Sequence, residues 1–182
     1  MPTMHLNVNQ SLWAITLAFT FYAAWIDGRT HRIPNWLTVS GFLAGLSLHT
    51  WLGGWRGAAV ALEGAGLALA VLLPLVFLRA LGAGDWKLMG ALGAFLGPWM
   101  LLFVLVATIF VAGFMAVILT FYARRVRETL RNMGALIKGF FVFGLRPNPE
   151  ISLDNPTLLK LPFGVAAAIG TFACFVAAHW VL

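Results

Sequence analysis

Long apolar segments separated by short polar ones make up most of this chain. Apolar runs cover residues 12–26, 36–52 and 57–81, then a stretch at 88–123 and a last run at 162–180. A helix of about 20 apolar residues crosses a hydrocarbon core about 30 Å thick. The runs are continuous and rich in Leu and Ala, without the alternation of a transmembrane barrel. The pattern therefore predicts membrane-spanning helices.

The stretch at 88–123 is too long to be a single crossing. As one helix it would extend about 54 Å at 1.5 Å per residue, well beyond a core about 30 Å thick. Gly97-Pro98 is the only strong helix-breaking pair near the required place. We therefore expect a short crossing over 86–96, tilted or partly re-entrant, and a longer one over 99–123. The sequence predicts an all-α polytopic membrane protein with six transmembrane helices.

Basic residues orient these six helices across the membrane. With both termini outside, on the periplasmic face, Arg56 is the only one of the 12 Lys and Arg residues that falls outside. A five-crossing scheme would lose this asymmetry. We thus expect one membrane-embedded domain over 1–182, with a single sizeable inner loop at 124–160. The first half of that loop has an amphipathic helical pattern, and the segment 139–150 is typical of irregular structure.

Composition supports the membrane interpretation and limits the partners. The chain is 61% hydrophobic and 10% charged, with a mean hydropathy of +0.90, which leaves almost nothing for a soluble domain. The net charge of +6 is distributed between apolar segments, where it meets lipid headgroups, so we predict no nucleic-acid partner. The single cysteine, Cys174, lies inside the last apolar run and predicts neither a disulfide nor a zinc site.

Two of the six acidic residues lie at the ends of predicted membrane helices and at the same predicted depth in the membrane. Asp27 ends the first crossing and Asp85 begins the fourth, so both belong to the inner side, whereas Glu63 lies near the outer end of the third. The remaining acids lie in the inner loop: Glu128, Glu150 and Asp154. An acidic side chain at a membrane boundary is costly unless it has a partner or a task. The ordinary alternative for each aspartate is a solvated boundary residue or a helix cap.

Paired carboxyl groups suit general acid–base hydrolysis. Two such groups close together share one proton, because both cannot easily ionise. The ionised member takes a proton from water, and the protonated member donates to a peptide carbonyl oxygen. This chemistry needs no metal, cofactor or side-chain nucleophile, and the chain has no HExxH, GxSxG or P-loop pattern. We expect Gly82 and Gly84 to allow positive φ angles and the close approach of an extended substrate to Asp85.

Three short segments resemble one known family. Gly82-Ala83-Gly84-Asp85-Trp86-Lys87 resembles the GxGDxK signature of the prepilin peptidases, which have the preflagellin peptidases and presenilins as more distant relatives. Asp27 followed by Arg32-Ile33-Pro34-Asn35 resembles the segment that holds their first aspartate, and Leu161-Pro162-Phe163-Gly164 is similar to a third Pro-aromatic-Gly element. The three segments occur in the order found in the family.

The resemblance implies that Asp27 and Asp85 are the catalytic dyad. It implies removal of a short basic leader from type IV prepilin or pseudopilin precursors, typically after a glycine, at the cytoplasmic face of the bacterial inner membrane. The chain lacks the paired CxxC motifs of the larger members that also methylate, so it resembles the short type found with tight-adherence (Flp-like) pili. Residues implied as active-site support or substrate-binding positions are Gly82, Gly84, Lys87, Pro34, Asn35, Pro162 and Gly164.

Other interpretations remain open at this point. An archaeal preflagellin peptidase is equally short. A small transporter could bind ions with Asp27, Asp85 and Glu63, and a pilus-assembly scaffold could have no catalytic activity. Smaller alternatives concern single residues: Lys87 could extend its ammonium group to the headgroups, and Gly90 and Gly93 could be ordinary packing positions. His31 could influence Asp27, whereas His49 has no assigned role.

Overall fold

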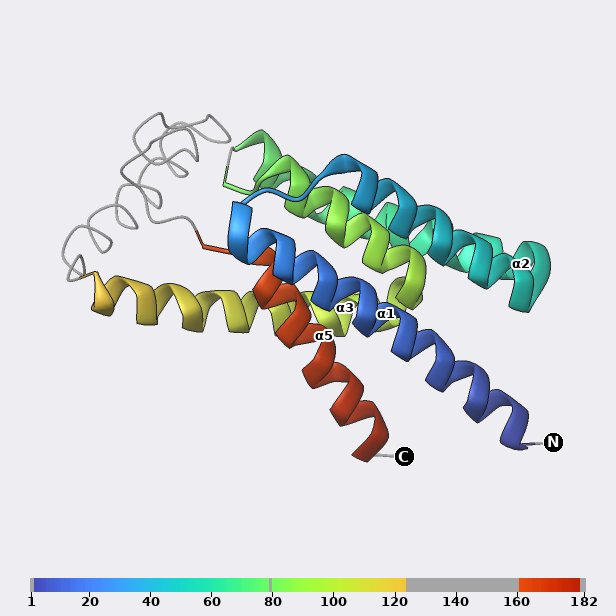
Figure 1. The fold of residues 1–182 in the computed structure, drawn as a ribbon. Helices are drawn as coiled ribbons and strands as arrows, with labels where there is room; N and C mark the ends of the chain where they lie inside the picture. Colours follow the sequence, from blue (N-terminus) through green and yellow to red (C-terminus); the bar gives the residue numbers. More distant parts are fainter. Residues whose placement is uncertain (1, 79, 124–160, 181–182) are drawn as a thin grey trace.

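The computed structural model describes residues 2–78, 80–123 and 161–180. These residues form four helical elements and no strand, which confirms the all-α prediction (Figure 1). The predicted amphipathic helix and irregular loop of 124–160 lie outside the described residues. The elements are α1 (Pro2–Thr30), α2 (Asn35–Phe77), α3 (Ala83–Tyr122) and α5 (Phe163–Trp180).

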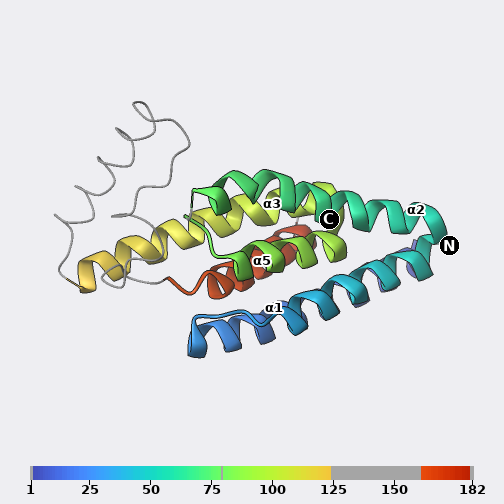
Figure 2. The ribbon, with the colours of Figure 1, turned by 90° about the horizontal axis from the view of Figure 1, so that it is seen from above.

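The two longest elements each double back at a glycine. In α2 the reversal lies at Gly54, with φ 57° and ψ −140°, and in α3 at Gly97, with φ 70° and ψ 175°. Such φ angles favour glycine because it has no Cβ, and Pro98 adds a residue without an N–H donor. Figure 2 shows both elements folding back on themselves. The break predicted at Gly97-Pro98 is confirmed, and the described chain contains six helical segments.

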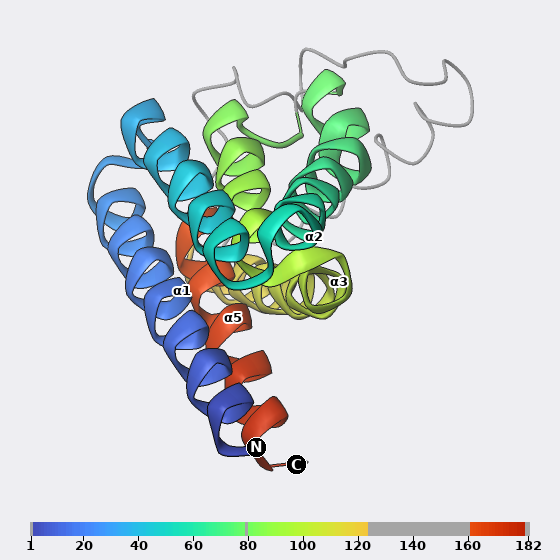
Figure 3. The same cartoon turned by 90° about the vertical axis from the view of Figure 1, so that its right-hand side faces the viewer.

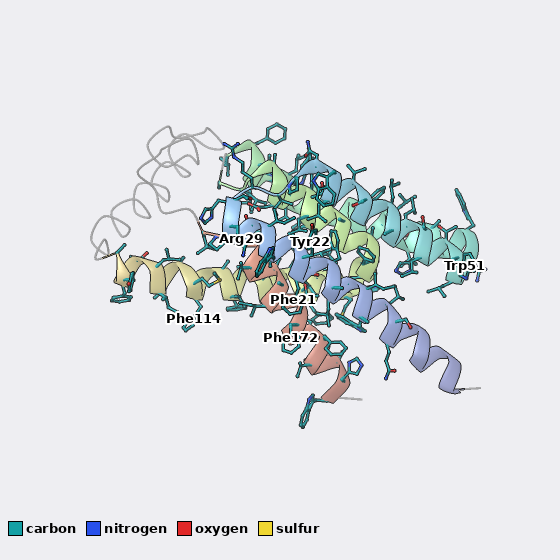
Figure 4. All side chains as sticks on the ribbon, in the orientation of Figure 1. Phe21, Tyr22, Arg29, Trp51, Phe114 and Phe172 are labelled. Carbon is teal, nitrogen blue, oxygen red and sulfur yellow. The ribbon has the colours of Figure 1, made fainter. Side chains whose placement is uncertain are left out.

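Three of the elements, α2, α3 and α5, are each long and apolar enough to cross a membrane. Large apolar side chains also face outward, as they do in a helix that contacts lipid. Phe21 and Phe172, 49% and 47% exposed, lie against each other on the surface of α1 and α5 in Figure 4. Trp51 is 89% exposed at the Gly54 turn, at the opposite end of the molecule from Arg29 (Figure 4). An exposed surface of this kind is typical of membrane proteins.

Helix boundaries differ from the predicted ones near both aspartates. The first helix continues to Thr30 instead of ending at residue 26, and α3 begins at Ala83 instead of 86. The extra turn of α1 ends at His31, whose φ of 49° is the left-handed conformation that terminates many helices. The N–H of His31 donates to the carbonyl oxygen of Asp27 at 2.8 Å. Asp27 therefore lies within the last turns of a helix, and Asp85 lies in the first turn of one.

Small residues let α2 and α3 pack closely. A Cβ on Gly64 would come within 2.1 Å of the Gly93 carbonyl oxygen, and one on Gly90 would meet Leu69 at 2.9 Å. The packing interpretation of Gly90 and Gly93 is thus confirmed. On the other side, α5 packs between α1 and α3 (Figure 3). The largest fully buried apolar side chains all come from α3: Leu88, Met89, Leu92, Leu101 and Val104.

Candidate functional site

The ends of four segments meet where Asp27 and Asp85 lie. Asp27 comes from the last turns of α1 and is 4% exposed, and Asp85 is partly buried in the first turn of α3. Their carboxyl groups interact electrostatically. The fold thus brings together the two acids that the sequence pairs, and we call them the acid pair.

The first turn of α5 holds the carboxyl group of Asp27. The backbone N–H of Gly164 donates to Asp27 Oδ2 at 2.7 Å. A Cβ on Gly164 would lie 3.0 Å from both the Cβ and Oδ2 of Asp27, so the glycine leaves room for this contact. Unpaired N–H groups and the helix dipole make a helix N-terminus favourable for a negative charge. Pro162 immediately precedes α5 and accepts a hydrogen bond from the Val165 N–H at 3.1 Å.

Asp85 also interacts with a helix N-terminus, that of its own helix. Gly82 is the N-cap of α3, and the Asp85 carboxyl group reaches back to its backbone N–H, much as the acid of a capping box does. A Cβ on Gly82 would lie 2.9 Å from Asp85 Oδ2. Gly82 is needed because a side chain would occupy the space that the carboxyl group takes.

The expected positive φ angles are wrong for Gly82 and Gly84. Gly82 has φ −68°, and the positive-φ glycines of the described residues are Gly54 and Gly97. The expected close approach does occur at Gly84, but the approaching backbone belongs to the chain itself. A Cβ on Gly84 would lie 3.3 Å from the Cβ and carbonyl oxygen of Ile33. Gly82 and Gly84 therefore leave room for the segment that carries Asp85 to pack against the segment that follows Asp27.

A side-chain hydrogen bond ties the same two segments. Lys87 Nζ donates to Asn35 Oδ1 at 2.9 Å, joining the first turns of α3 and α2. Lys87 thus has a hydrogen-bond partner within the protein. Pro34 is the N-cap of α2 and accepts the N–H of Leu37 at 3.1 Å. The predicted supporting residues of all three motifs therefore surround the acid pair.

Trp86 and His31 also belong to this region. Trp86 Nε1 donates to the Leu69 carbonyl oxygen at 2.9 Å, which fixes the first turn of α3 on α2. The sequence motif assigns Trp86 no role of its own, although an indole N–H at an apolar boundary usually has a partner. His31 is exposed and interacts electrostatically with Asp27, as considered from the sequence.

Glu63 lies apart from the acid pair, and it is exposed on α2. Its neighbour Gly64 contacts Gly93, which is about 12 Å along α3 from Asp85. The sequence predicts that Glu63 lies far from the acid pair, near the other end of its crossing, and in the structure it is exposed and separate from that pair. In the part of the chain that the structure describes, no three His, Cys, Asp or Glu residues form a group that could hold a metal ion.

These features define an all-α membrane protein with an interacting pair of carboxyl groups, a class suited to acid–base hydrolysis. The model of the type IV leader peptidase family matches residues 14–117, more than half of the chain, and the chain belongs to that family. The resemblance found in the sequence is thereby confirmed, and the chain is a peptidase by family. No curated protein and no solved structure matched. The matched range holds both aspartates but ends before Gly164, so the third motif is supported here by its contact with Asp27.

Proposed function

We propose that this protein is a membrane-embedded aspartic endopeptidase that removes the short basic leader of type IV prepilin-like precursors of the Flp type. Membership in the leader peptidase family supports the reaction class. The single observation that carries the aspartic mechanism is that the fold brings the carboxyl groups of Asp27 and Asp85 near enough to interact electrostatically. Glu63, exposed and outside this pair, gives no support to a three-acid ion site.

The surroundings of the two carboxyl groups suggest different roles. Both carboxyl groups accept a backbone N–H, Asp27 from Gly164 at 2.7 Å and Asp85 from Gly82, but Asp27 also lies near His31, and a nearby positive charge favours the charged form of a carboxyl group. In the proposed mechanism Asp27 is the base that takes a proton from water as the water oxygen attacks the scissile carbonyl carbon. Asp85 is the acid that donates its proton to the carbonyl oxygen. When the tetrahedral gem-diol collapses, the C–N bond breaks and Asp27 gives its proton to the leaving amine nitrogen. As the C=O bond re-forms, a hydroxyl of the diol returns a proton to Asp85, which restores the starting state.

The proposed topology places the acid pair at the cytoplasmic face of the inner membrane. Six crossings fit the six helical segments of α1, α2, α3 and α5. In Figure 1 both chain ends lie toward the end of the molecule that holds the Gly54 turn, away from the loops that carry the acid pair. Both termini would then be periplasmic, as the distribution of basic residues predicts.

Co-expression with a type IV prepilin-like precursor tests this function directly. Removal of the leader is scored by the mass of the product. We expect Asp27→Asn and Asp85→Asn each to abolish cleavage while the protein still accumulates in the membrane. Glu63→Gln is the matched control, because it neutralises an acid of the same helical region outside the site. Cleavage that persists in either aspartate variant would refute the aspartic mechanism.

A further inference from the structure

A cavity of about 430 Å³ lies between the end of α1 and the start of α2, along the segment that follows Asp27. Two of its walls adjoin the two acids: Ile26 immediately precedes Asp27, and Ile33 packs against Gly84, which immediately precedes Asp85. The hydrolytic steps proposed above make no use of this space. Among the described residues, the lining that defines the α1–α2 cavity is Ile26, Thr30, Arg32, Ile33, Pro34 and Asn35.

Of the described residues that line the α1–α2 cavity, Arg32 is the one with a charged side chain. Arg32 is exposed, and its guanidinium has no hydrogen bond or ion pair within the part of the chain that the structure describes. Arg29, at the same end of α1, differs because its guanidinium stacks on the Trp25 ring with 4.1 Å to the ring centroid. A guanidinium group has five N–H donors and no acceptor. The unpaired Arg32 therefore favours a ligand that is an anionic acceptor.

Asn35 adds further donors to the same cavity. The ammonium group of Lys87 can only donate, so its 2.9 Å bond must use the amide oxygen of Asn35. That bond fixes the orientation of the amide and leaves the Nδ2 group with its N–H donors. The hydroxyl of Thr30 is already used within the loop. Its single proton is directed to the carbonyl oxygen of Ile26 or of Arg32, each at 2.9 Å, and its oxygen accepts the Arg32 N–H at 3.3 Å. The side-chain polar groups that remain for a ligand, the Arg32 guanidinium and the Asn35 Nδ2 group, are therefore donors, and the rest of the lining is largely apolar.

We propose that the α1–α2 cavity binds an acidic side chain of the precursor, with Arg32 as a specificity-determining residue. This inference rests on the proposed function. Arg pairs with a carboxylate through two parallel charge-assisted hydrogen bonds, and the amide of Asn35 supplies another donor. A basic leader residue would meet Arg32 as a like charge, which disfavours the wrong register of the substrate. The acid would enter the cavity when the scissile bond lies at the acid pair.

The test measures KM and kcat for the full-length protein in phosphatidylcholine vesicles. Each acidic residue of a cleavable precursor is replaced in turn by its amide, and each precursor is assayed with the unsubstituted protein and with Arg32→Gln. For one acid we expect the amide to raise KM about fivefold with the unsubstituted protein, the size expected of an ion pair at a partly exposed site. With Arg32→Gln the same replacement should leave KM unchanged. Arg29→Gln is the matched control and should respond like the unsubstituted protein.

Three outcomes would overturn the proposal. Arg32→Gln could raise KM equally for all precursors, which would show that it recognises no particular acid. Its effect could be confined to vesicles that contain anionic phosphatidylglycerol, which would assign Arg32 to a lipid phosphate. The unsubstituted protein could cleave no precursor at all, and then the proposed function would fail first and this inference with it.

Discussion

The two ends of the helical bundle differ in how their segments are held together. At the acid-pair end, hydrogen bonds between elements join α5 to α1, α3 to the start of α2, and α3 to the second half of α2. At the Gly54 end, His49 Nε2 bonds the Phe95 carbonyl oxygen at 2.9 Å, and a cavity of about 400 Å³ separates the segments. That cavity is lined by Gln10, Leu12, Trp13, Thr16, His49, Phe95, Leu96, Met100, Ala178 and His179.

This difference indicates where precise geometry is required. Catalysis by paired carboxyl groups needs both groups held within a small fraction of an ångström, because small displacements cost large factors in rate. Hydrogen bonds between segments distant in the sequence supply that precision around Asp27 and Asp85. The Gly54 end has no comparable demand under the proposed function, so a cavity between its segments is tolerated. Substitutions at the two ends should therefore have unequal effects on cleavage.

The largest effect is expected where α5 meets Asp27. In Gly164→Val the new side chain would occupy the space beside the Asp27 carboxyl group, since even a Cβ would lie 3.0 Å from its Oδ2. Displacing one acid should lower kcat/KM about 100-fold, measured as the rate of leader removal. Gly66→Val is the control, because a Cβ on Gly66 meets nothing within 4 Å. Equal losses of kcat/KM in both variants would show that added bulk anywhere in these helices impairs cleavage. The proposed difference between the two ends of the bundle would then be wrong.

An intermediate effect is expected at the bond between Lys87 and Asn35. Removing it in Lys87→Met should loosen the loop after Asp27 relative to the first turn of α3 and lower kcat about tenfold. Asn35→Ala should cost a similar factor, and the double variant should lose no more than either single one, because both remove one interaction. Cleavage rates of the three variants form the double-mutant cycle. Losses that multiply in the double variant would contradict a shared positioning role.

Local features of the sequence predict much of this site. Asp85 stands out because a carboxyl group beside a long apolar run is costly, and Gly97-Pro98 stands out because both residues disrupt a helix. Each signal depends only on neighbours in the chain. The pairing of Asp27 with Asp85 needed a further step, in which the assumed crossings placed both acids at one level.

The remaining features depend on contacts between distant segments. The resemblance to the family marks Gly164 as a supporting residue, but the sequence does not show that its N–H donates to Asp27. Gly82 and Gly84 were assigned positive φ angles, but their role is to leave space for the Asp85 carboxyl group and for Ile33. The last turn of α1 was missed because a polar segment with basic residues resembles a loop. In the structure the N–H of His31 still bonds the Asp27 carbonyl oxygen.

The smallest effect on cleavage is expected from the hydrogen bond at the Gly54 end. Phe95 lies in the last turn before the break at Gly97, where helix carbonyl groups lose their usual donors, and His49 supplies one. His49→Leu would leave that carbonyl oxygen unpaired and should lower the stability of the folded state by about 1–3 kcal/mol. The rate of leader removal below the melting temperature should stay within about twofold, since a surplus of folded protein remains. Thermal unfolding in detergent and the cleavage assay measure the two quantities separately. A loss of cleavage as large as that of Lys87→Met, at a temperature where the variant is folded, would show that the Gly54 end also positions the acid pair.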